Sequence, residues 1–211
     1  MEIICFDEID STQTYLINEI ENGRLKAPVA ILASMQTAGI GSRDNKWISE
    51  KGNFFASFAV PLKDLPTDLK LASASIYFGS IMSEILKNIN SEVWLKWPND
   101  IYKNENKIAG IITKKINDSL VCGIGINFVG LPEGLASIET EIEPIKLLSM
   151  YLDEVEQFPK WKQVFSKVQL EFHKSKILYF NIEKYQNIIR DAIMCNDGSL
   201  LINGERVYSL R

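Results

Sequence analysis

A polar, glycine-bearing loop is the first segment whose residue types could do chemistry. It covers residues 36–47 and reads QTAGIGSRDNKW, with Gly39 and Gly41 two positions apart. Glycines at this spacing let backbone N–H groups approach an anion closely, and Arg43 adds positive charge. Trp47 offers a face on which a purine could stack, although a surface loop with this tryptophan packed into the core is the commoner arrangement. The loop has neither the GxxxxGKS/T spacing of a P-loop nor the third glycine of a dinucleotide fingerprint, so neither site is predicted.

A second polar cluster lies where the segment LKWPND is followed by KIAG. Lys96 leaves a predicted strand, and the proline after it forces a turn that presents Asn99 and Asp100. Their oxygens suit Mg²⁺ or a lysine amine. Lys107 begins the next predicted strand, and Gly110 would let a ligand lie against the backbone. A reverse turn with solvated lysines explains the same residues, so turn chemistry alone leaves both interpretations open.

Two shorter motifs add hydrogen-bonding groups. The segment DSTQ places Ser11, Thr12 and Gln13 where a strand passes into a helix, and these side chains can bind a polar ligand or simply cap the helix. In GIGINF, the alternate glycines Gly123 and Gly125 indicate close approach of a ligand or another chain, and Asn127 could read an adenine edge. Tight internal packing is the alternative for these glycines.

The elements that must position these motifs follow from the apolar patterns. Short β-branched and aromatic runs between turn residues predict strands, and apolar residues that recur every three or four positions predict helices. The first helix is expected after Asp10 or Ser11, and the second has a break near Gly79 as one option. The predicted strands are 2–8, 29–34, 54–62, 92–96, 107–114 and 120–128, and the later helices are 67–90, 145–155 and 160–177.

Residues 192–211 are expected to form a small β appendage. Asp197-Gly198 and Asn203-Gly204 are tight-turn signals between very short strands. Hairpins and helices in this order predict an α+β fold whose helices cover one face of the sheet.

Composition excludes several functional classes. The chain has 211 residues, 46% of them hydrophobic and 24% charged, as expected for one medium globular domain with or without an appendage. The 23 basic and 27 acidic residues give a net charge of −4, so no chain-wide basic field for DNA or RNA exists. The N-terminus has no basic flank and no apolar run is long enough for a membrane span, which predicts a cytoplasmic protein.

The cysteines and the single histidine predict no catalytic or metal role. Cys5, Cys122 and Cys195 lie far apart without CxxC spacing, which favours free thiols in a reducing compartment over disulfides or zinc. His173 lies in a predicted helix remote from every motif, so Ser-His or Cys-His catalysis has little support.

The order of DSTQ, QTAGIGSRDNKW, LKWPND with KIAG, and GIGINF resembles that of the biotin protein ligases, or biotin–(acetyl-CoA-carboxylase) ligases, over about residues 1–130. The resemblance implies a class II synthetase-like core, which is a mixed, mostly antiparallel sheet backed by helices. It implies a catalytic domain over residues 1–180 and a shortened SH3-like β appendage over residues 181–211.

One segment departs from that family. Its loop usually reads GRGRxGRxW, whereas this chain has Ile40, Ser42 and Asn45 at the places of three arginines. Only Arg43 and Lys46 remain as loop cations. We expect Arg43 to replace a missing charge, and we expect the backbone contacts of the glycine segment to survive.

The resemblance implies a two-step reaction with ATP, Mg²⁺ and biotin. The biotin carboxylate attacks the α-phosphorus to give biotinyl-5'-AMP, and a lysine of a biotin carboxyl carrier protein then attacks the mixed anhydride. By the same resemblance, Lys107 meets the carboxylate and the acyl phosphate, and Asp100 orients the incoming lysine. The remaining assignments are Ser11, Thr12, Gln13 and Gln36 for the biotin head, Lys96, Asn99 and Asp100 for triphosphate and Mg²⁺, Arg43 for lost charge, Trp47 and Asn127 for adenine, and Gly39, Ile40, Gly41, Ser42, Gly110 and Gly125 for close ligand contact.

Two alternatives belong to other classes. A lipoate or octanoate ligase or transferase has related architecture, but its glycine-arginine-histidine loop is not found here. A non-enzymatic biotin sensor or repressor would need a DNA-binding module, and the first catalytic strand is expected to begin at residue 2. We therefore expect neither DNA nor a membrane as a partner.

Overall fold

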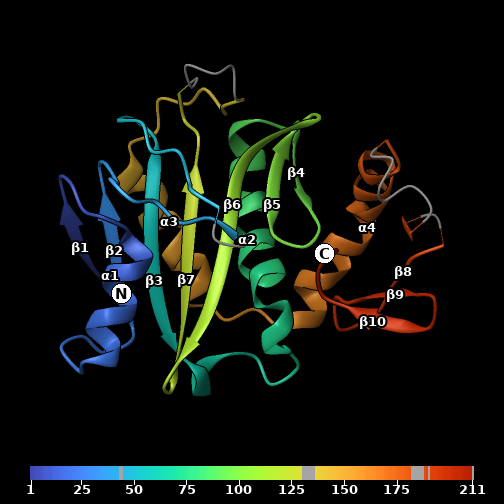
Figure 1. Ribbon diagram of the computed structural model, residues 1–211, viewed down its shortest axis with the longest axis horizontal. Helices are drawn as coiled ribbons and strands as arrows, with labels where there is room; N and C mark the ends of the chain where they lie inside the picture. The colour runs from blue at the N-terminus through green and yellow to red at the C-terminus, as the bar shows by residue number, and fades with distance from the viewer. Residues whose placement is uncertain (43–44, 130–135, 182–187, 190, 211) are drawn as a thin grey trace.

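The computed structural model describes residues 1–42, 45–129, 136–181, 188–189 and 191–210. Its centre is a seven-stranded sheet in the order β1-β2-β3-β7-β6-β5-β4 (Figure 1). β1 and β2 are parallel and every other neighbouring pair is antiparallel, which confirms the mixed, mostly antiparallel sheet. The strands are β1 Glu2–Phe6, β2 Val29–Ala33, β3 Phe54–Pro61, β4 Val93–Lys96, β5 Asp100–Lys103, β6 Asn106–Ile116 and β7 Ser119–Ile126.

Strand β5 is missing from the sequence prediction. Its four residues follow the proline of LKWPND, and a charged residue stands at each end, so no apolar run marks it. The chain turns back after β4 so that Lys96 pairs with Asp100, and β5 then pairs with β6 on its other side. The polar turn of the motif thus lies between two hydrogen-bonded strands rather than in a free loop.

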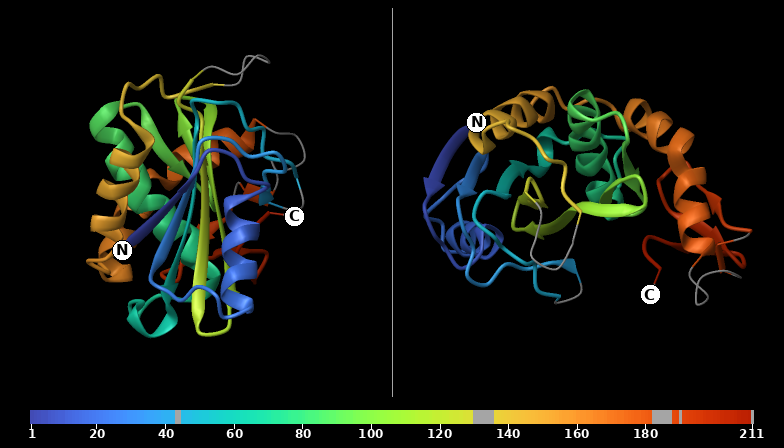
Figure 2. Two further views of the ribbon diagram at one scale, coloured as in Figure 1. Left: turned by 90° about the vertical axis from the view of Figure 1, so that its left-hand side faces the viewer. Right: turned by 90° about the horizontal axis from the view of Figure 1, so that it is seen from above.

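Four helices accompany the sheet: α1 Thr12–Glu21, α2 Ala74–Ile89, α3 Pro144–Val155 and α4 Trp161–Phe180. Seen along the sheet, α2 and α3 lie on one side and α1 on the other (Figure 2). The prediction that helices cover one face is therefore wrong for α1. Its buried Leu16 and Ile20 pack in a separate apolar cluster with Ile31, Ile116 and Val121 on the opposite face.

Helix α2 begins later than its apolar pattern predicts. Leu71–Ser73 form a short 3₁₀ turn, and the α-helix starts at Ala74 and runs unbroken through Gly79. A Cβ at Gly79 would lie 3.0 Å from Cδ1 of Leu95, so this glycine lets the helix pack closely on the sheet instead of breaking it.

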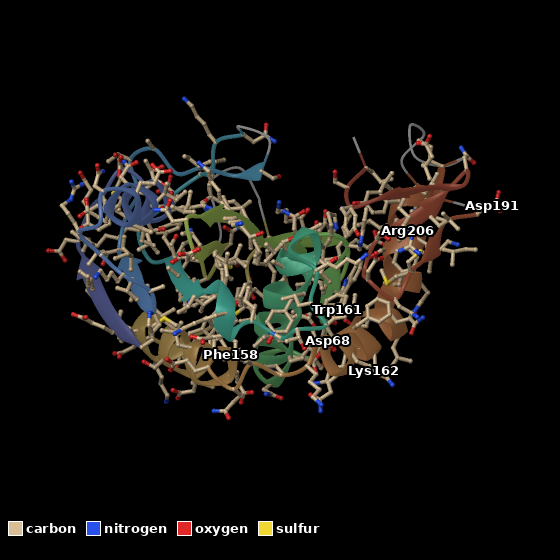
Figure 3. All side chains as sticks on the ribbon, turned by 90° about the horizontal axis from the view of Figure 1, so that it is seen from below. Asp68, Phe158, Trp161, Lys162, Asp191 and Arg206 are labelled. Atoms are coloured by element: carbon tan, nitrogen blue, oxygen red, sulfur yellow. The ribbon has the colours of Figure 1, made fainter. Side chains whose placement is uncertain are left out.

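Helix α4 begins at a contact with the segment that precedes α2. The backbone N–H groups of Trp161 and Lys162 each donate to a carboxylate oxygen of Asp68 at 3.1 Å, as their places in Figure 3 show. A carboxylate at this end satisfies free N–H groups and faces the positive end of the helix dipole. The start of α4 is thereby held against the rest of the chain.

The C-terminal segment forms a second sheet of three strands, β8 Ile193–Met194, β9 Leu200–Ile202 and β10 Glu205–Val207, beside α4 (Figure 1). Both predicted turns are present, with positive φ at Gly198 and at Asn203 and Gly204. Met194, Leu200 and Leu210 are buried in the same apolar cluster as the main sheet. The appendage is thus packed into the common core, and a domain boundary at residue 180 stays a prediction.

Among the described residues, no helix combines the length and the apolar character that crossing a membrane requires.

Candidate active site

The candidate site lies on the face of the sheet that carries α1. The loop after β2 crosses this face, on the side opposite to α2 and α3 (Figures 1 and 2). Gly123 and Gly125 of β7 lie beneath it. A Cβ at Gly123 would meet the Gln13 carboxamide at 3.1 Å, and one at Gly125 would meet Cε2 of Trp47 at 2.3 Å. The alternate glycines therefore admit two side chains of this same chain against the strand, which is the tight internal packing that the sequence left open as the alternative.

A buried polar cluster joins the start of α1 to the loop. The backbone N–H and the hydroxyl of Thr12 both lie within hydrogen-bond distance of Gln36 Oε1, at 2.9 and 3.1 Å, and the hydroxyl is 2.9 Å from that of Ser57. Ser11 caps α1 by accepting from the N–H of Thr14 at 3.3 Å. DSTQ thus does both things that its sequence allows, because one residue caps the helix while its neighbours face a cavity.

That cavity is small, about 20 Å³. Its wall is mostly neutral and hydrogen-bonding, and it suits an uncharged polar group. It is lined by Ser11, Thr12, Gln13, Gln36, Ile40, Trp47, Ser57, Ile112, Gly123, Ile124 and Gly125.

A second, more open cavity of about 220 Å³ lies on the other side of Trp47. Trp47 and Ile112 line both cavities, so they form the wall between them. The second cavity is lined by Gly41, Ser42, Asn45, Lys46, Trp47, Ile48, Asn99, Asp100, Lys107, Gly110, Ile111, Ile112 and Asn127.

Charge in the second cavity centres on one carboxylate between two ammonium groups. Lys107 Nζ lies 2.6 Å from Asp100 Oδ1, and Lys96 Nζ lies 4.0 Å from Asp100 Oδ2. The strand register makes this possible, because Asp100 stands opposite Gly110. A Cβ at Gly110 would lie 3.1 Å from Cζ3 of Trp47, so the glycine leaves room for the indole ring beside Lys107. Two cations and one anion leave an excess positive charge that favours an anionic ligand.

Lys96 is placed differently from the other predicted residues. Its side chain is only 9% exposed, and its Nζ lies 4.1 Å from the centre of the Tyr179 ring and 5.3 Å from that of Tyr102. Lys96 thus stands behind the cavity wall and reaches the site through Asp100.

Two asparagines complete the wall. Asn99 Nδ2 donates to the carbonyl of Ile111 at 2.9 Å, and the N–H of Ile111 donates to the Asn99 carbonyl at 2.9 Å. Asn127 is buried, and its Nδ2 donates to the Ala136 carbonyl at 3.1 Å. Both side chains are therefore fixed by backbone partners before any ligand arrives.

The fold brings nearly all predicted site residues to one of the two cavities. Of the described ones, Lys96 and Gly39 line neither cavity. Gly39 is a buried residue of the loop itself, where a Cβ would lie 2.8 Å from the Trp47 carbonyl. Arg43 lies outside the described residues. Ser57 and Ile112 were missed, and Ser57 had a signal, since it is a lone hydroxyl in the apolar run of β3.

Oxygen donors for a divalent cation are few. Within the described part of the chain, no three His, Cys, Asp or Glu side chains gather as a metal site. The second cavity offers the Asp100 carboxylate and the side-chain oxygen of Asn99. This set fits Mg²⁺ that is held mainly by phosphates and water, which needs only one or two protein oxygens.

The model of the biotin/lipoate A/B protein ligase family matches residues 5–128, which is more than half of the chain, and the chain belongs to this family.

Two bacterial relatives have matching sequences. The bifunctional ligase/repressor BirA of Escherichia coli K12 is 39% identical over 126 residues, 56% of this chain and 38% of that protein. A biotin–(acetyl-CoA-carboxylase) ligase of Mycobacterium tuberculosis is 29% identical over 128 residues, 58% of this chain and 48% of that protein. The match thus spans less than half the length of either relative.

Solved structures match over nearly the full chain. The biotin acetyl coenzyme A carboxylase synthetase of Helicobacter pylori, with bound biotinylated ATP, superposes with a TM-score of 0.86 at 34% identity, covering 97% of this chain and 98% of that one. The biotin protein ligase of Aquifex aeolicus, in complex with biotin and ATP, has a TM-score of 0.75 at 23% identity, covering 99% and 96%. The second likeness concerns the fold alone.

Proposed function

We propose that this protein is an ATP-dependent biotin protein ligase. The observation that carries the proposal is the pairing of a neutral, hydrogen-bonding cavity with a cationic one across Trp47. Biotin has an uncharged ureido ring at one end and a carboxylate at the other, so it needs both environments within one site. The relatives and solved structures named above support the same activity.

In the first step, a biotin carboxylate oxygen attacks the α-phosphorus of ATP, the bond to pyrophosphate breaks, and biotinyl-5'-AMP forms. In the second, a lysine amine attacks the acyl carbon, AMP leaves, the amide forms and the amine loses a proton. Both steps move negative charge between oxygens, so fixed cations and donors are what the protein must supply. Lys107 is placed for this role, with Asp100 holding its ammonium group in position.

The other residues divide by cavity. Thr12, Gln13 and Gln36, with Ser11 and Ser57, hold the ureido head. A ring there requires Ile40 and the loop residues next to it to move outward, because the described cavity has room for about one water. The cationic cavity takes the adenylate, with Trp47 and Asn127 at adenine and Gly41, Ser42, Gly110 and Gly125 leaving space near the backbone. Asn99 and Asp100 face the triphosphate with Lys96 behind them. We propose Gly39 for close contact with the ligand and Arg43 for the charge that the missing loop arginines would supply.

Asn99 and Asp100 would hold Mg²⁺ that arrives with ATP, and the cation would neutralise phosphate charge. The acceptor we propose is the lysine of a biotin carboxyl carrier protein, and the compartment we propose is the cytoplasm. Free Cys5, Cys122 and Cys195 fit a reducing environment.

Mass spectrometry of a biotin carboxyl carrier domain incubated with the protein, ATP, Mg²⁺ and biotin tests the proposal. We expect a mass increase of one biotin that depends on ATP. Parallel reactions with lipoate and octanoate separate the related ligases, and modification by either one in place of biotin would refute the assignment. Tight biotin binding without any transfer would identify a sensor instead.

A further inference from the structure

Trp97, in the middle of LKWPND, has every polar group bound by the C-terminal part of the chain. It is 1% exposed. Its backbone N–H donates to Ser175 Oγ at 3.1 Å, its carbonyl accepts from the Tyr179 hydroxyl at 2.9 Å, and its indole N–H donates to the Gly198 carbonyl at 2.8 Å. All three partners lie beyond residue 128, where the family match ends.

Two of these partners come from one face of α4. Ser175 and Tyr179 are four residues apart, so their side chains project from the same side of the helix. The ring of Tyr179 also faces the ammonium of Lys96 at 4.1 Å. Helix α4 therefore contacts both Lys96, whose ammonium group lies beside Asp100, and Trp97, the residue after Lys96.

The third partner belongs to a turn that is itself anchored. Three consecutive carbonyls of this turn accept side-chain hydrogen bonds: Asn196 from the Trp161 indole at 2.7 Å, Asp197 from the Ser73 hydroxyl, and Gly198 from Trp97. Gly198 has φ of +83°, and a Cβ there would lie 3.0 Å from the Trp161 ring, so glycine is required at this position.

The side chain of Asp197 fixes the same turn. Its carboxylate accepts from the Lys70 ammonium at 3.1 Å, from Arg206 at 2.8 Å and from the Tyr208 hydroxyl at 3.0 Å, and also from Ser199. Several bonds from different segments thus give Trp97 a rigid acceptor.

The chain is short between Trp97 and the charged centre. Asn99 lies two residues on and is paired with Ile111, and Asp100 then meets Lys107 at 2.6 Å. A shift of Trp97 is therefore passed to Asn99 and Asp100, because few bonds lie between them.

The geometry points to Ser175, Tyr179 and the carbonyl of Gly198 as the positioning groups that set the nucleotide end of the site through Trp97. This inference rests on the proposed ligase function. It gives the C-terminal part of the chain a specific role, which is to place Asn99 and Asp100 for the triphosphate. The cavity for the biotin head, built from α1, β3 and the loop, is not under its control.

The test compares Tyr179→Phe and Trp97→Phe with Trp161→Phe. The first keeps the ring under Lys96 and removes only the hydroxyl bond to Trp97. The second removes the indole bond to Gly198 and also leaves a smaller ring at a buried position. The matched control also removes an indole bond to the same turn, but at the carbonyl of Asn196, one step further from the site. Each variant is assayed by pyrophosphate exchange with ATP and biotin varied separately, and its melting temperature is recorded.

We expect Tyr179→Phe and Trp97→Phe to lower kcat/KM for ATP about tenfold, while KM for biotin changes by less than about twofold. Trp161→Phe should retain kcat/KM for ATP within about twofold even where its melting temperature falls as much. Equal losses in all three variants, or equal effects on ATP and biotin, would overturn the inference.

A measurement without substrates separates this inference from the proposed function. Amide hydrogen exchange over residues 96–103 should speed up in Tyr179→Phe and stay as in wild type in Trp161→Phe. If the wild-type protein fails to biotinylate a carrier domain, the proposed function falls while the exchange result still decides the positioning. Unchanged exchange in Tyr179→Phe refutes the positioning whatever the activity.

Discussion

Replacing Gly125 by alanine would test whether Trp47 must lie flat against β7. The new Cβ would lie 2.3, 2.6 and 2.7 Å from three atoms of the indole ring. Carbon atoms in favourable contact are about 3.5 Å apart, so something must move by roughly 1 Å. Strand β7 is hydrogen-bonded on both sides, with Gly125 opposite Phe55 of β3 and Gly110 of β6. We therefore expect the loop that carries Trp47 to move away from the strand.

The magnitude follows from the place of that ring. Trp47 forms the wall between the cavities, and Lys107 Nζ lies 5.7 Å from its ring centre. A misplacement of about 1 Å at a reacting centre costs about 100-fold in rate, so we expect kcat/KM for adenylate formation to fall by about that factor. The strand pairing is kept, so the melting temperature should fall by no more than about 4 °C, the equivalent of about 1 kcal/mol in a chain of this size.

Pyrophosphate exchange is the assay, and it is run in the wild type and in a Trp47→Ala background. Without the indole, Gly125→Ala should cost less than about threefold, because the clash has gone. Gly79→Ala is the matched control, since it adds a methyl group to a buried glycine on the far side of the sheet, and it should keep full activity. An equal loss from Gly125→Ala in both backgrounds would refute the steric explanation.

Three further outcomes are expected. Lys107→Ala should lower adenylate formation by two to three orders of magnitude, with the melting temperature kept because the side chain is 39% exposed; near-normal pyrophosphate exchange would contradict its role. The pKa of the Asp197 carboxyl is raised by burial but lowered more by hydrogen bonds from Ser199, Lys70 and Tyr208, which hold it well below its usual range. Its contribution to stability is therefore complete above about pH 5 and is lost as the pH falls below about 4, so urea unfolding should depend less on pH there in Asp197→Asn than in wild type. Met82→Ala, at a fully buried position of α2, should cost about 2–5 kcal/mol in urea unfolding, and a loss below about 1 kcal/mol would mean that the packing around it is loose.

Most strands could be predicted because their signals are local. Val29–Ala33 and Phe54–Pro61 are continuous apolar runs that lie buried at the middle of the sheet, and a polar turn with Asn117 at positive φ separates β6 from β7. The side of the sheet on which α1 packs could not be predicted from local signals. The apolar face of α1 fits either side, and the choice depends on partners such as Ile31 and Val121, which are distant in sequence.

In the candidate site too, local features could be predicted and contacts between residues distant in sequence could not. Motif order was enough to gather Asp100, Lys107 and Gly110, since they lie on strands that pair directly, and Asn99 just before β5 bonds to Ile111 of β6. The burial of Lys96 could not be anticipated, because the ring beneath it belongs to Tyr179 on α4, more than eighty positions further along the chain. A lysine in a strand reads as a solvated charge until a tertiary partner covers it.

The central ion pair explains how an acidic chain would hold the two anionic substrates of the proposed reaction. A net charge of −4 repels nucleotide and carboxylate at long range, so attraction must be local and fixed. Asp100 removes part of the local positive charge, yet it holds the Lys107 ammonium at 2.6 Å and is itself braced by Lys96. An ammonium has three donors, so Lys107 can keep Asp100 while it meets a substrate oxygen. Asp100 thus fixes the position of the Lys107 ammonium group. A cation that is already in place is what charge stabilisation in a transition state requires.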